Sequence, residues 1–380
     1  QPGETRSVRI EVESKATSIW DAIEAHWPDG RTWLRSWLPG AGCTAKTGSG
    51  VTLGVSTKVE SQLRLVEFGP GLLQLRVDGP PGAPSPSEGS VVALVEYEDG
   101  TTETLAADLD GKQILGWRLD EGLCHLAIVS RVGAPTRRLA GVAAVDSVAS
   151  ALGVGYAIVD RPADNRGLVR VESDGTLEVL RTVGDSPDRG FCSVARSLVF
   201  QGRHGPVQAW YYPPTNASFR APGGTRPPAL MRVHGGPTAM TTNAYNATVQ
   251  FWTSRGFAVL DVNYSGSAGF GRRWRDRLKG LWGVADVDDC IDAAEAAIDA
   301  GLADPGRLAI AGGSSGGFTA LRALTSSDRF AAAIIRYGVV DLTALLDTHK
   351  FESRYLDSLV GRYPAEEKLY RTRSPINNLD

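Results

Sequence analysis

The sequence predicts an α/β fold with a mostly parallel sheet, preceded by a β-rich or α+β region at the N-terminus. Three observations support this prediction. From about residue 197 to the end, apolar strand-like runs alternate with helix-like runs, which is typical of a parallel sheet covered by helices. A glycine-rich turn at 312–317 joins one of these strands to a helix. Before residue 135, the strand-like runs are short and are separated by turn signals.

Strand and helix candidates follow one another through the C-terminal half in the order that this fold requires. Strands are expected at 228–233, 257–262, 308–311 and 331–335. A helix is expected between the second and third strands, because apolar residues recur there near the helical period at Val284, Val287, Ile291, Ala294 and Ile298. Gly301 is placed to end this helix. Its first turns, where the helix dipole favours anions, contain Asp286, Asp288 and Asp289.

The turn Gly312-Gly313-Ser314-Ser315-Gly316-Gly317 fits the nucleophile elbow of the α/β-hydrolase fold, in which a serine lies between a strand and a helix. Small residues are needed there because the turn is strained and crowded. The G-x-S-x-G pattern fits in two registers, and the spacing from the strand favours Ser314 over Ser315 as the nucleophile. A phosphate-binding loop would need a lysine where Phe318 stands.

The segment His234-Gly235-Gly236-Pro237 directly follows the strand at 228–233. A glycine pair at this point lets backbone N–H groups approach a ligand closely. We therefore expect the N–H groups of Gly236 and Ser315 to stabilise the oxyanion formed in acyl transfer. The alternative is a simple turn. His234 itself is expected to be structural, because the base in this fold follows the serine in sequence.

Several motifs in a fixed order resemble the prolyl oligopeptidase family, and within it the acylaminoacyl-peptidase and dipeptidyl-peptidase-like branch. The resemblance covers the chain from about residue 200 onwards. It rests on His234–Thr238, Phe251–Phe257, Asp261–Ser267, the turn at 312–317, His349–Tyr355 and Tyr370–Ile376. It implies a serine peptidase of short peptides or acyl-aminoacyl substrates, with Ser314 as the nucleophile, no cofactor and no metal.

The resemblance also implies a catalytic acid and a histidine base after the segment at Ser374, but the sequence given ends at Asp380. The only histidine after the elbow is His349, in a segment that the family does not use as its base. Asp341 and Asp347 are more simply interpreted as capping or solvated residues. The sequence therefore predicts an incomplete triad and little or no peptidase activity for this chain alone.

The sequence predicts three regions: an α+β domain at 1–135, a β segment resembling a last propeller blade at 136–195, and a partial catalytic domain at 196–380. In the first region, helices are expected at 17–27, around Trp33–Trp37 and at 117–129, together with a hairpin across Asp99-Gly100. This pattern resembles the START-like helix-grip fold. The alternative is a set of divergent propeller blades, with strands about every 8–12 residues.

Composition excludes several other classes of protein. The net charge of −3 offers no general attraction for nucleic acid or an anionic membrane, and no apolar run reaches spanning length. The four cysteines fit no metal site, so a reducing cytoplasm is expected. A solvated loop is the favoured interpretation of the basic residues Arg272, Arg273, Arg275, Arg277 and Lys279. Substrate-binding residues and oligomeric state stay open.

Two other functions remain compatible with the sequence. One is a carboxylesterase on the same fold, which a comparison of ester and peptide substrates would separate from a peptidase. The other is an inactive hydrolase remnant fused to a small-molecule-binding module. That alternative predicts that residues 1–135 bind an apolar ligand and that a fluorophosphonate does not label Ser314.

Overall fold

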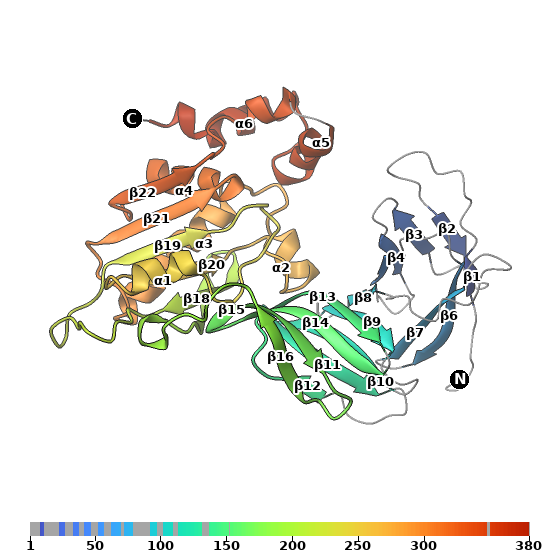
Figure 1. Cartoon of the computed structure of the whole chain (residues 1–380). Coiled ribbons are helices and arrows are strands. Elements are labelled where there is room, and N and C mark those ends of the chain that lie inside the picture. Colours follow the sequence, from blue (N-terminus) through green and yellow to red (C-terminus); the bar gives the residue numbers. More distant parts are fainter. Residues whose placement is uncertain are drawn as a thin grey trace. The chain divides into compact units, whose positions relative to one another are not determined.

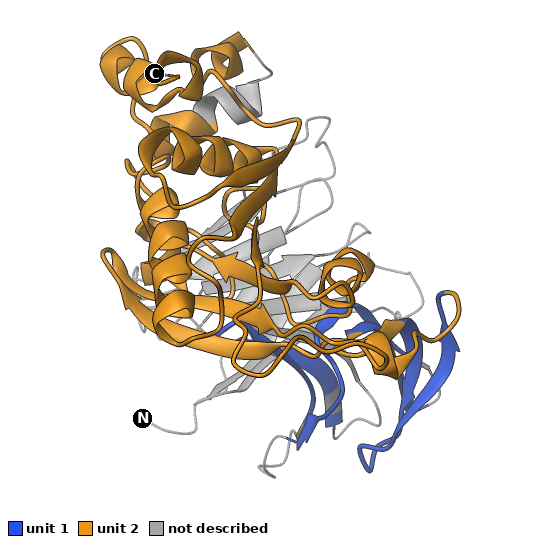
Figure 2. Ribbon diagram, turned by 90° about the vertical axis from the view of Figure 1, so that its left-hand side faces the viewer, with its two compact units in different colours: residues 1–160, 166–183 blue, residues 161–165, 184–380 orange. Residues whose placement is uncertain are grey.

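Figure 1 shows the chain as a computed structural model. The structure describes residues 8–10, 23–26, 33–37, 42–46, 52–56, 62–69, 72–78, 92–96, 102–108, 113–130, 137–151, 153–347 and 350–379. The chain divides into two compact units, one of residues 1–160 and 166–183, the other of residues 161–165 and 184–380 (Figure 2). Among the described residues, no helix combines the length and apolar character that crossing a bilayer requires.

The described elements of the first unit are all strands. They form a three-stranded sheet (β1-β6-β7), a nine-stranded sheet (β12-β11-β10-β9-β8-β5-β4-β3-β2) and a four-stranded sheet (β13-β14-β15-β16). Their bounds are β1 Val8–Ile10, β2 Ile23–His26, β3 Trp33–Trp37, β4 Gly42–Lys46, β5 Thr52–Ser56, β6 Gln62–Gly69, β7 Leu72–Asp78, β8 Val92–Glu96, β9 Thr102–Asp108, β10 Gln113–Asp120, β11 Leu123–Ser130, β12 Arg137–Leu139, β13 Ala144–Ala151, β14 Val154–Arg161, β15 Asp164–Val171 and β16 Leu177–Thr182.

The helices predicted in the N-terminal region are wrong. Strand β2 occupies 23–26, strand β3 occupies 33–37, and the hairpin of β10 and β11 replaces the helix expected at 117–129. The start of the first predicted helix, 17–22, lies outside the described residues. The START-like interpretation depended on these helices, so it is wrong at these segments. The propeller-blade alternative and the domain boundaries at 135 and 195 stay predictions.

The β10–β11 hairpin shows why helical spacing misled the prediction. Its strands pair antiparallel from Gln113↔Ser130 to Asp120↔Leu123. They are joined by Glu121 and Gly122, which both have positive φ (48° and 77°), as the tight turn of a two-residue hairpin requires. Cys124, Leu126 and Ile128 of β11 are buried, whereas Leu123 and His125 between them are less so, and the small Ala127 is buried as well. A period of two therefore describes this segment, although three of its leucines also lie at helical spacings.

The hairpin expected across Asp99-Gly100 is confirmed. Strands β8 and β9 pair antiparallel on either side of Asp99-Gly100. Strands β15 and β16 do the same around Asp174-Gly175, where Gly175 has a φ of +86°. The small core of this part of the chain is formed by Leu115, Leu126, Ile128, Leu139, Val142, Val148, Ala157, Val159, Val169 and Val171.

The second unit contains a six-stranded sheet in the order β17-β18-β20-β19-β21-β22. The first three strands pair antiparallel, whereas β20, β19, β21 and β22 are parallel to one another, so the predicted mostly parallel α/β fold is confirmed. The strand bounds are β17 Arg196–Gly202, β18 Gly205–Tyr212, β19 Ala229–Val233, β20 Ala258–Asn263, β21 Leu308–Gly313 and β22 Ala332–Arg336. Because parallel strands end at the same edge of a sheet, the segments after β19, β20 and β21 emerge near one another.

Six α-helices accompany this sheet among the described residues. They are α1 Ala247–Thr253, α2 Arg272–Asp276, α3 Ala285–Asp299, α4 Ser315–Ser326, α5 Lys350–Leu359 and α6 Glu367–Arg373. Short 3-10 helices lie at Arg189–Phe191, Thr343–Asp347 and Pro375–Asn377. The helix predicted from the 284–298 stripe is α3, and it packs with α4 over the sheet through a core that includes Val287, Ala294, Met231, Ile310 and Ala320.

A separate apolar cluster supports the start of α4. Phe318 is fully buried against Leu278, Trp282, Leu342 and Tyr370, which come from segments before and after it. The buried Arg373 closes this cluster by donating hydrogen bonds from Nη1 to the carbonyl of Trp282 (3.0 Å) and from Nη2 to that of Gly280 (2.9 Å). Through these contacts, the segment from α5 to the last 3-10 helix packs against the start of α4 and stabilises the strand–helix turn.

Candidate active site

The turn predicted as a nucleophile elbow connects β21 directly to α4. Ser314 is the single residue between them, with φ 54° and ψ −125°, and its side chain is exposed. Its backbone N–H donates to the carbonyl of Arg336, at the end of β22, over 3.1 Å. A non-glycine residue with positive φ is strained by roughly 1–3 kcal/mol, and such strain is concentrated at functional sites.

Three glycines allow this turn to pack against its neighbours. A Cβ atom on Gly312 would lie 2.1 Å from the carbonyl oxygen of Gly316, and one on Gly316 would lie 2.3 Å from that of Val233. One on Gly317 would lie 2.7 Å from the Cα of Gly338. All of these contacts are with backbone, which cannot move aside without shifting a strand or the helix. The glycine pattern therefore reflects close approach of β19, β21 and α4.

The two candidate serines have different environments. Ser315 is the first residue of α4 and is only 5% exposed, whereas the side chain of Ser314 faces solvent. The first N–H groups of an α-helix have no partner within the helix, so the N–H of Ser315 is free of intrahelical bonding. The geometry thus favours Ser314 as the reactive hydroxyl and leaves the Ser315 amide as a donor beside it.

The His-Gly-Gly-Pro segment lies against the elbow, as the sequence predicted. It begins where β19 ends at Val233. A Cβ atom on Gly235 would be 3.3 Å from the carbonyl of Gly313 and 3.7 Å from the Cβ of Ser314. Gly236 is exposed and has a φ of +113°, a conformation that favours glycine. The structure therefore brings the three predicted residues Gly236, Ser314 and Ser315 to one edge of the sheet.

His234 is structural in the described contacts. Its Nδ1 lies 2.9 Å from the carbonyl oxygen of Gly235, and its Nε2 lies 2.7 Å from the hydroxyl of Ser267. The ring stacks on Tyr264 with centroids 4.3 Å apart. Burial lowers the pKa of His234, so the neutral ring is favoured at pH 7. Both ring nitrogens are engaged, which agrees with the prediction that His234 is not the base.

The other residues considered as triad partners are Asp341, Asp347 and His349. Asp341 accepts hydrogen bonds from the N–H (2.8 Å) and hydroxyl (2.7 Å) of Thr343, and these contacts lower its pKa. Its carboxylate is therefore engaged locally, just before the 3-10 helix Thr343–Asp347. Asp347 is exposed. His349 lies outside the described residues.

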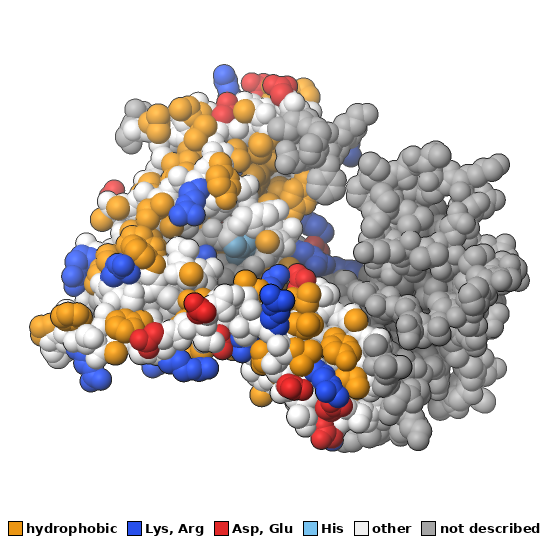
Figure 3. Space-filling model, viewed as in Figure 1, with side chains coloured by type: hydrophobic (Ala, Val, Ile, Leu, Met, Phe, Trp, Pro, Cys, Tyr) orange, Lys and Arg blue, Asp and Glu red, His pale blue; other side chains and the backbone are white. Residues whose placement is uncertain are grey.

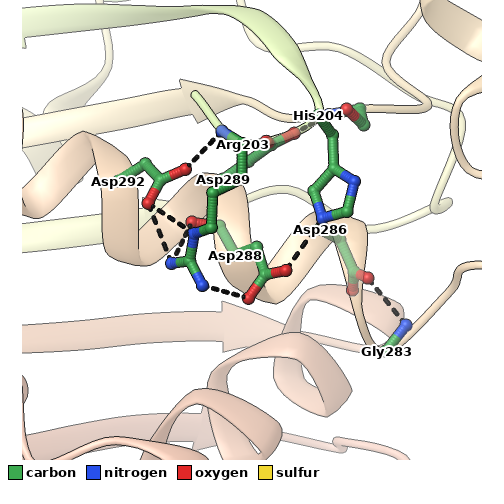
Figure 4. A network of polar contacts seen from close by, with 8 residues as sticks. Arg203, His204, Gly283, Asp286, Asp288, Asp289 and Asp292 are labelled. Atoms are coloured by element: carbon green, nitrogen blue, oxygen red, sulfur yellow. Dashed lines mark hydrogen bonds and ion pairs between the residues drawn. The ribbon is translucent and has the colours of Figure 1, made fainter. Parts of the chain in front are cut away.

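Carboxylates of α3 anchor the start of α4 and the neighbouring loops. Figure 4 shows four of these carboxylates, those of Asp286, Asp288, Asp289 and Asp292. Asp286, which is fully buried, accepts hydrogen bonds from the N–H of Gly283 (2.6 Å) and from the hydroxyl of Thr319 in the second turn of α4. Asp289 accepts from the N–H of Ser265 over 2.6 Å. The sequence placed these residues in the first turns of a helix as partners of its dipole, and it gave no sign that Asp286 and Asp289 are buried.

A second part of this network lies nearer the surface. Arg203 and His204, in the turn between β17 and β18, both contact Asp288, with Nη1–Oδ1 and Nε2–Oδ2 distances of 2.8 Å. Arg203 also donates to Asp292 (Figure 4). These contacts attach the β17–β18 turn to α3. They also give Nε2 of the His204 ring a hydrogen-bond partner.

We expect the Asp286→Asn variant to lose a pH dependence of stability that the wild type shows. Burial raises the pKa of Asp286 to about 6 from 3.8, so the folded chain binds this proton more tightly than the unfolded chain. The wild-type free energy of unfolding should therefore decrease by about 3 kcal/mol relative to the variant as pH rises from about 4 to about 6. Urea unfolding between pH 4 and 7, followed by tryptophan fluorescence, measures this difference.

The conservative variant Thr319→Ser keeps the hydroxyl that donates to Asp286 and should retain the wild-type pH dependence. Other carboxyl groups titrate in every variant, so the difference between wild type and Asp286→Asn isolates one group. If plots of the free energy of unfolding against pH run parallel for these two proteins, they would contradict a buried Asp286 that titrates in this range.

The basic residues at 272–279 were expected in a solvated loop, but residues 272–276 form helix α2. Arg277 lies over the ring of Trp274 at 4.3 Å and donates to the carbonyl of Pro206 over 2.6 Å. Lys279 forms an exposed ion pair with Asp276. On the face shown in Figure 3, the lysine and arginine side chains of the described residues are dispersed in small groups. The described residues also contain no group of three or more side chains placed to hold a metal ion.

Comparisons with known proteins agree with this geometry. Residues 243–380 match the model of the prolyl oligopeptidase family. The acylamino-acid-releasing enzyme of Arabidopsis thaliana is 32% identical over 188 residues, which are 47% of this chain and 24% of that protein. The dipeptidyl aminopeptidase BIII of Pseudoxanthomonas mexicana is 35% identical over 160 residues, which are 40% of this chain and 23% of that protein.

A solved structure resembles a larger part of the chain. The crystal structure of a puromycin hydrolase has a TM-score of 0.72 and 27% sequence identity, and the match covers 94% of this chain and 58% of that one. The chain thus spans about a quarter of the length of the curated relatives that it matches. The predicted resemblance to a peptidase family with an α/β-hydrolase fold is confirmed.

Proposed function

We propose that this chain, similar in its C-terminal part to the prolyl oligopeptidase family, carries the nucleophile and oxyanion donors of a serine peptidase. Its substrates would be short peptides or acyl-aminoacyl compounds, and a cytoplasmic location would suit its three described cysteines, which are free. The observation that carries this proposal is the exposed Ser314 hydroxyl at a strained strand–helix junction beside the glycine pair 235–236.

The proposed reaction follows from the positions of these groups. The Ser314 hydroxyl attacks the substrate carbonyl, loses its proton to a base and forms a tetrahedral intermediate. The N–H groups of Gly236 and Ser315 stabilise the negative charge on the carbonyl oxygen, and each such donor is worth about 10²–10³-fold in rate. Collapse of the intermediate expels the amine, which takes up the proton held by the base, and leaves an acyl-enzyme that water then hydrolyses.

A base and an acid complete this reaction in related folds. In the described part of the second unit, His204 is bonded to Asp288, and His234 is bonded through both ring nitrogens. We therefore propose that the 380-residue chain by itself turns over substrate slowly, because a serine without its base is a weak nucleophile at neutral pH. Hydrolysis of an aminoacyl chromogenic amide measures this activity.

Covalent labelling tests the proposed nucleophile independently of turnover. We expect a fluorophosphonate to modify the folded chain once, slowly because the serine lacks its base, and mass spectrometry to locate the adduct on Ser314 rather than Ser315. A urea-unfolded sample is the control, because reactivity that depends on the elbow should vanish there. An unmodified chain after prolonged incubation, or an adduct on Ser315, would contradict the proposal and favour the inactive-remnant alternative.

A further inference from the structure

We propose that His234 is a positioning residue, which orients the Gly236 N–H toward the oxyanion by holding the carbonyl of Gly235. This inference rests on the proposed function, because it assigns a role to the neighbour of a proposed oxyanion donor. It concerns one peptide group, that between Gly235 and Gly236. The carbonyl of Gly235 and the N–H of Gly236 both belong to that group.

The direction of the N–H follows from the direction of the carbonyl. The only cis peptide bond in the described chain is Tyr363-Pro364, so the Gly235-Gly236 peptide is trans. In a planar trans peptide, the N–H and C=O bonds point in opposite directions. A contact that holds the carbonyl oxygen on one side therefore holds the amide hydrogen on the other.

This peptide needs an external restraint. Glycine on both sides removes the Cβ atoms that normally limit rotation, and Gly236 already has a φ of +113°. A flipped peptide would present a carbonyl oxygen to the developing oxyanion and repel it. The hydrogen bond from the His234 ring, 2.9 Å from Nδ1 to the carbonyl oxygen of Gly235, opposes such a flip.

The hydrogen-bond partners determine the tautomer of His234. A carbonyl oxygen can only accept, so Nδ1 must carry the hydrogen that it donates to Gly235. In the neutral ring, Nε2 then accepts the hydroxyl hydrogen of Ser267, 2.7 Å away. Ser267 is fully buried, so its hydroxyl has a fixed partner here.

Tyr264 contacts both the ring and the backbone of His234. Its ring stacks on the imidazole, and its hydroxyl donates to the carbonyl of His234 over 3.0 Å. Burial raises the pKa of Tyr264 well above its ordinary value, so the hydroxyl remains a donor at neutral pH. Tyr264 thus restrains the ring plane and the backbone of His234, while Gly235 and Ser267 restrain its two ring nitrogens.

The substitutions His234→Asn and His234→Gln distinguish a positioning role of His234 from a packing role. The side-chain amide of Asn can occupy the place of Nδ1 and donate to Gly235, whereas the longer Gln mimics Nε2 and leaves that carbonyl without a donor. We expect His234→Gln to lower the rate of fluorophosphonate labelling by about 10²-fold, as for loss of one oxyanion donor. His234→Asn should retain a rate within about tenfold of the wild type.

The matched control is His204→Ala, which removes a histidine from the β17–β18 turn and should leave the labelling rate unchanged. A pure packing role predicts the reverse order, because Gln fills more of the imidazole volume than Asn. Equal rates for the two amide variants, or a faster His234→Gln, would overturn the proposal.

Nitrogen NMR of ¹⁵N-histidine-labelled chain supplies a readout that does not depend on catalysis. At pH 7 we expect His234, identified by its absence from the His234→Asn spectrum, to be neutral with the proton on Nδ1. A proton on Nε2, or on both nitrogens, contradicts the positioning contact. A wild-type chain that is not labelled would contradict the proposed nucleophile, and the NMR result then decides the positioning contact by itself.

Discussion

Replacing Ser314 by alanine is expected to abolish fluorophosphonate labelling, by more than about 10³-fold, while Ser315→Ala retains labelling within about tenfold of the wild type. Ser314 is exposed between β21 and α4, whereas the Ser315 side chain is buried in the first turn of the helix. The backbone N–H of residue 315, which is the proposed oxyanion donor, survives the Ser315→Ala substitution. The second-order rate constant of labelling measures both effects.

The pair of variants also settles the register of the glycine-rich motif. Alanine and serine have the same restrictions at positive φ, so Ser314→Ala should not unfold the turn, and its melting temperature serves as the control. Labelling that persists in Ser314→Ala and is lost in Ser315→Ala would assign the nucleophile to the other register.

The Gly312→Ala substitution is expected to destabilise the second unit by about 3 kcal/mol and to remove the labelling of Ser314. The new Cβ would lie 2.1 Å from the carbonyl oxygen of Gly316 and 2.8 Å from the backbone nitrogen of Gly317. Helix α4 would therefore have to move away from β21, which displaces the hydroxyl and the Ser315 amide together. Thermal unfolding measures the loss of stability.

Gly306→Ala is the matched control in the turn before the same strand. Its Cβ would meet nothing closer than the Asp304 carboxylate at 3.6 Å, which is an ordinary contact. This variant should melt close to the wild type and retain its labelling rate. A Gly312→Ala protein that behaves like the Gly306→Ala control would contradict the close approach of α4 to β21.

Much of the catalytic unit could be predicted because its signals are local. The parallel strands contain short apolar runs, and the Gly-Gly-Ser-Ser-Gly-Gly turn can join strand to helix in few ways. The N-terminal region gave weaker signals. Residues 117–129 satisfy a helical spacing and a strand alternation at once, and pairing of β10 with β11 decided between them.

No local sequence pattern indicated the hydrogen-bond network around the elbow. Asp286 was predicted as a helix-dipole partner, yet its carboxylate is fully buried against Thr319, which is 33 positions further along the chain. His234 was predicted to be structural, but its partner Ser267 lies 33 positions away on the segment after β20. Sequence spacing shows neither contact, because each depends on which strands become neighbours in the sheet.

The sequence by itself therefore determined the strand–serine–helix junction and the glycine pair that precedes it. These features depend on backbone conformations that only certain residues adopt, and such restrictions act within a few residues. The tertiary structure decided which serine is exposed, where the Gly235 carbonyl is held and what surrounds the Asp286 carboxylate. Those properties depend on burial and hydrogen bonding between segments that only the order of the strands brings together.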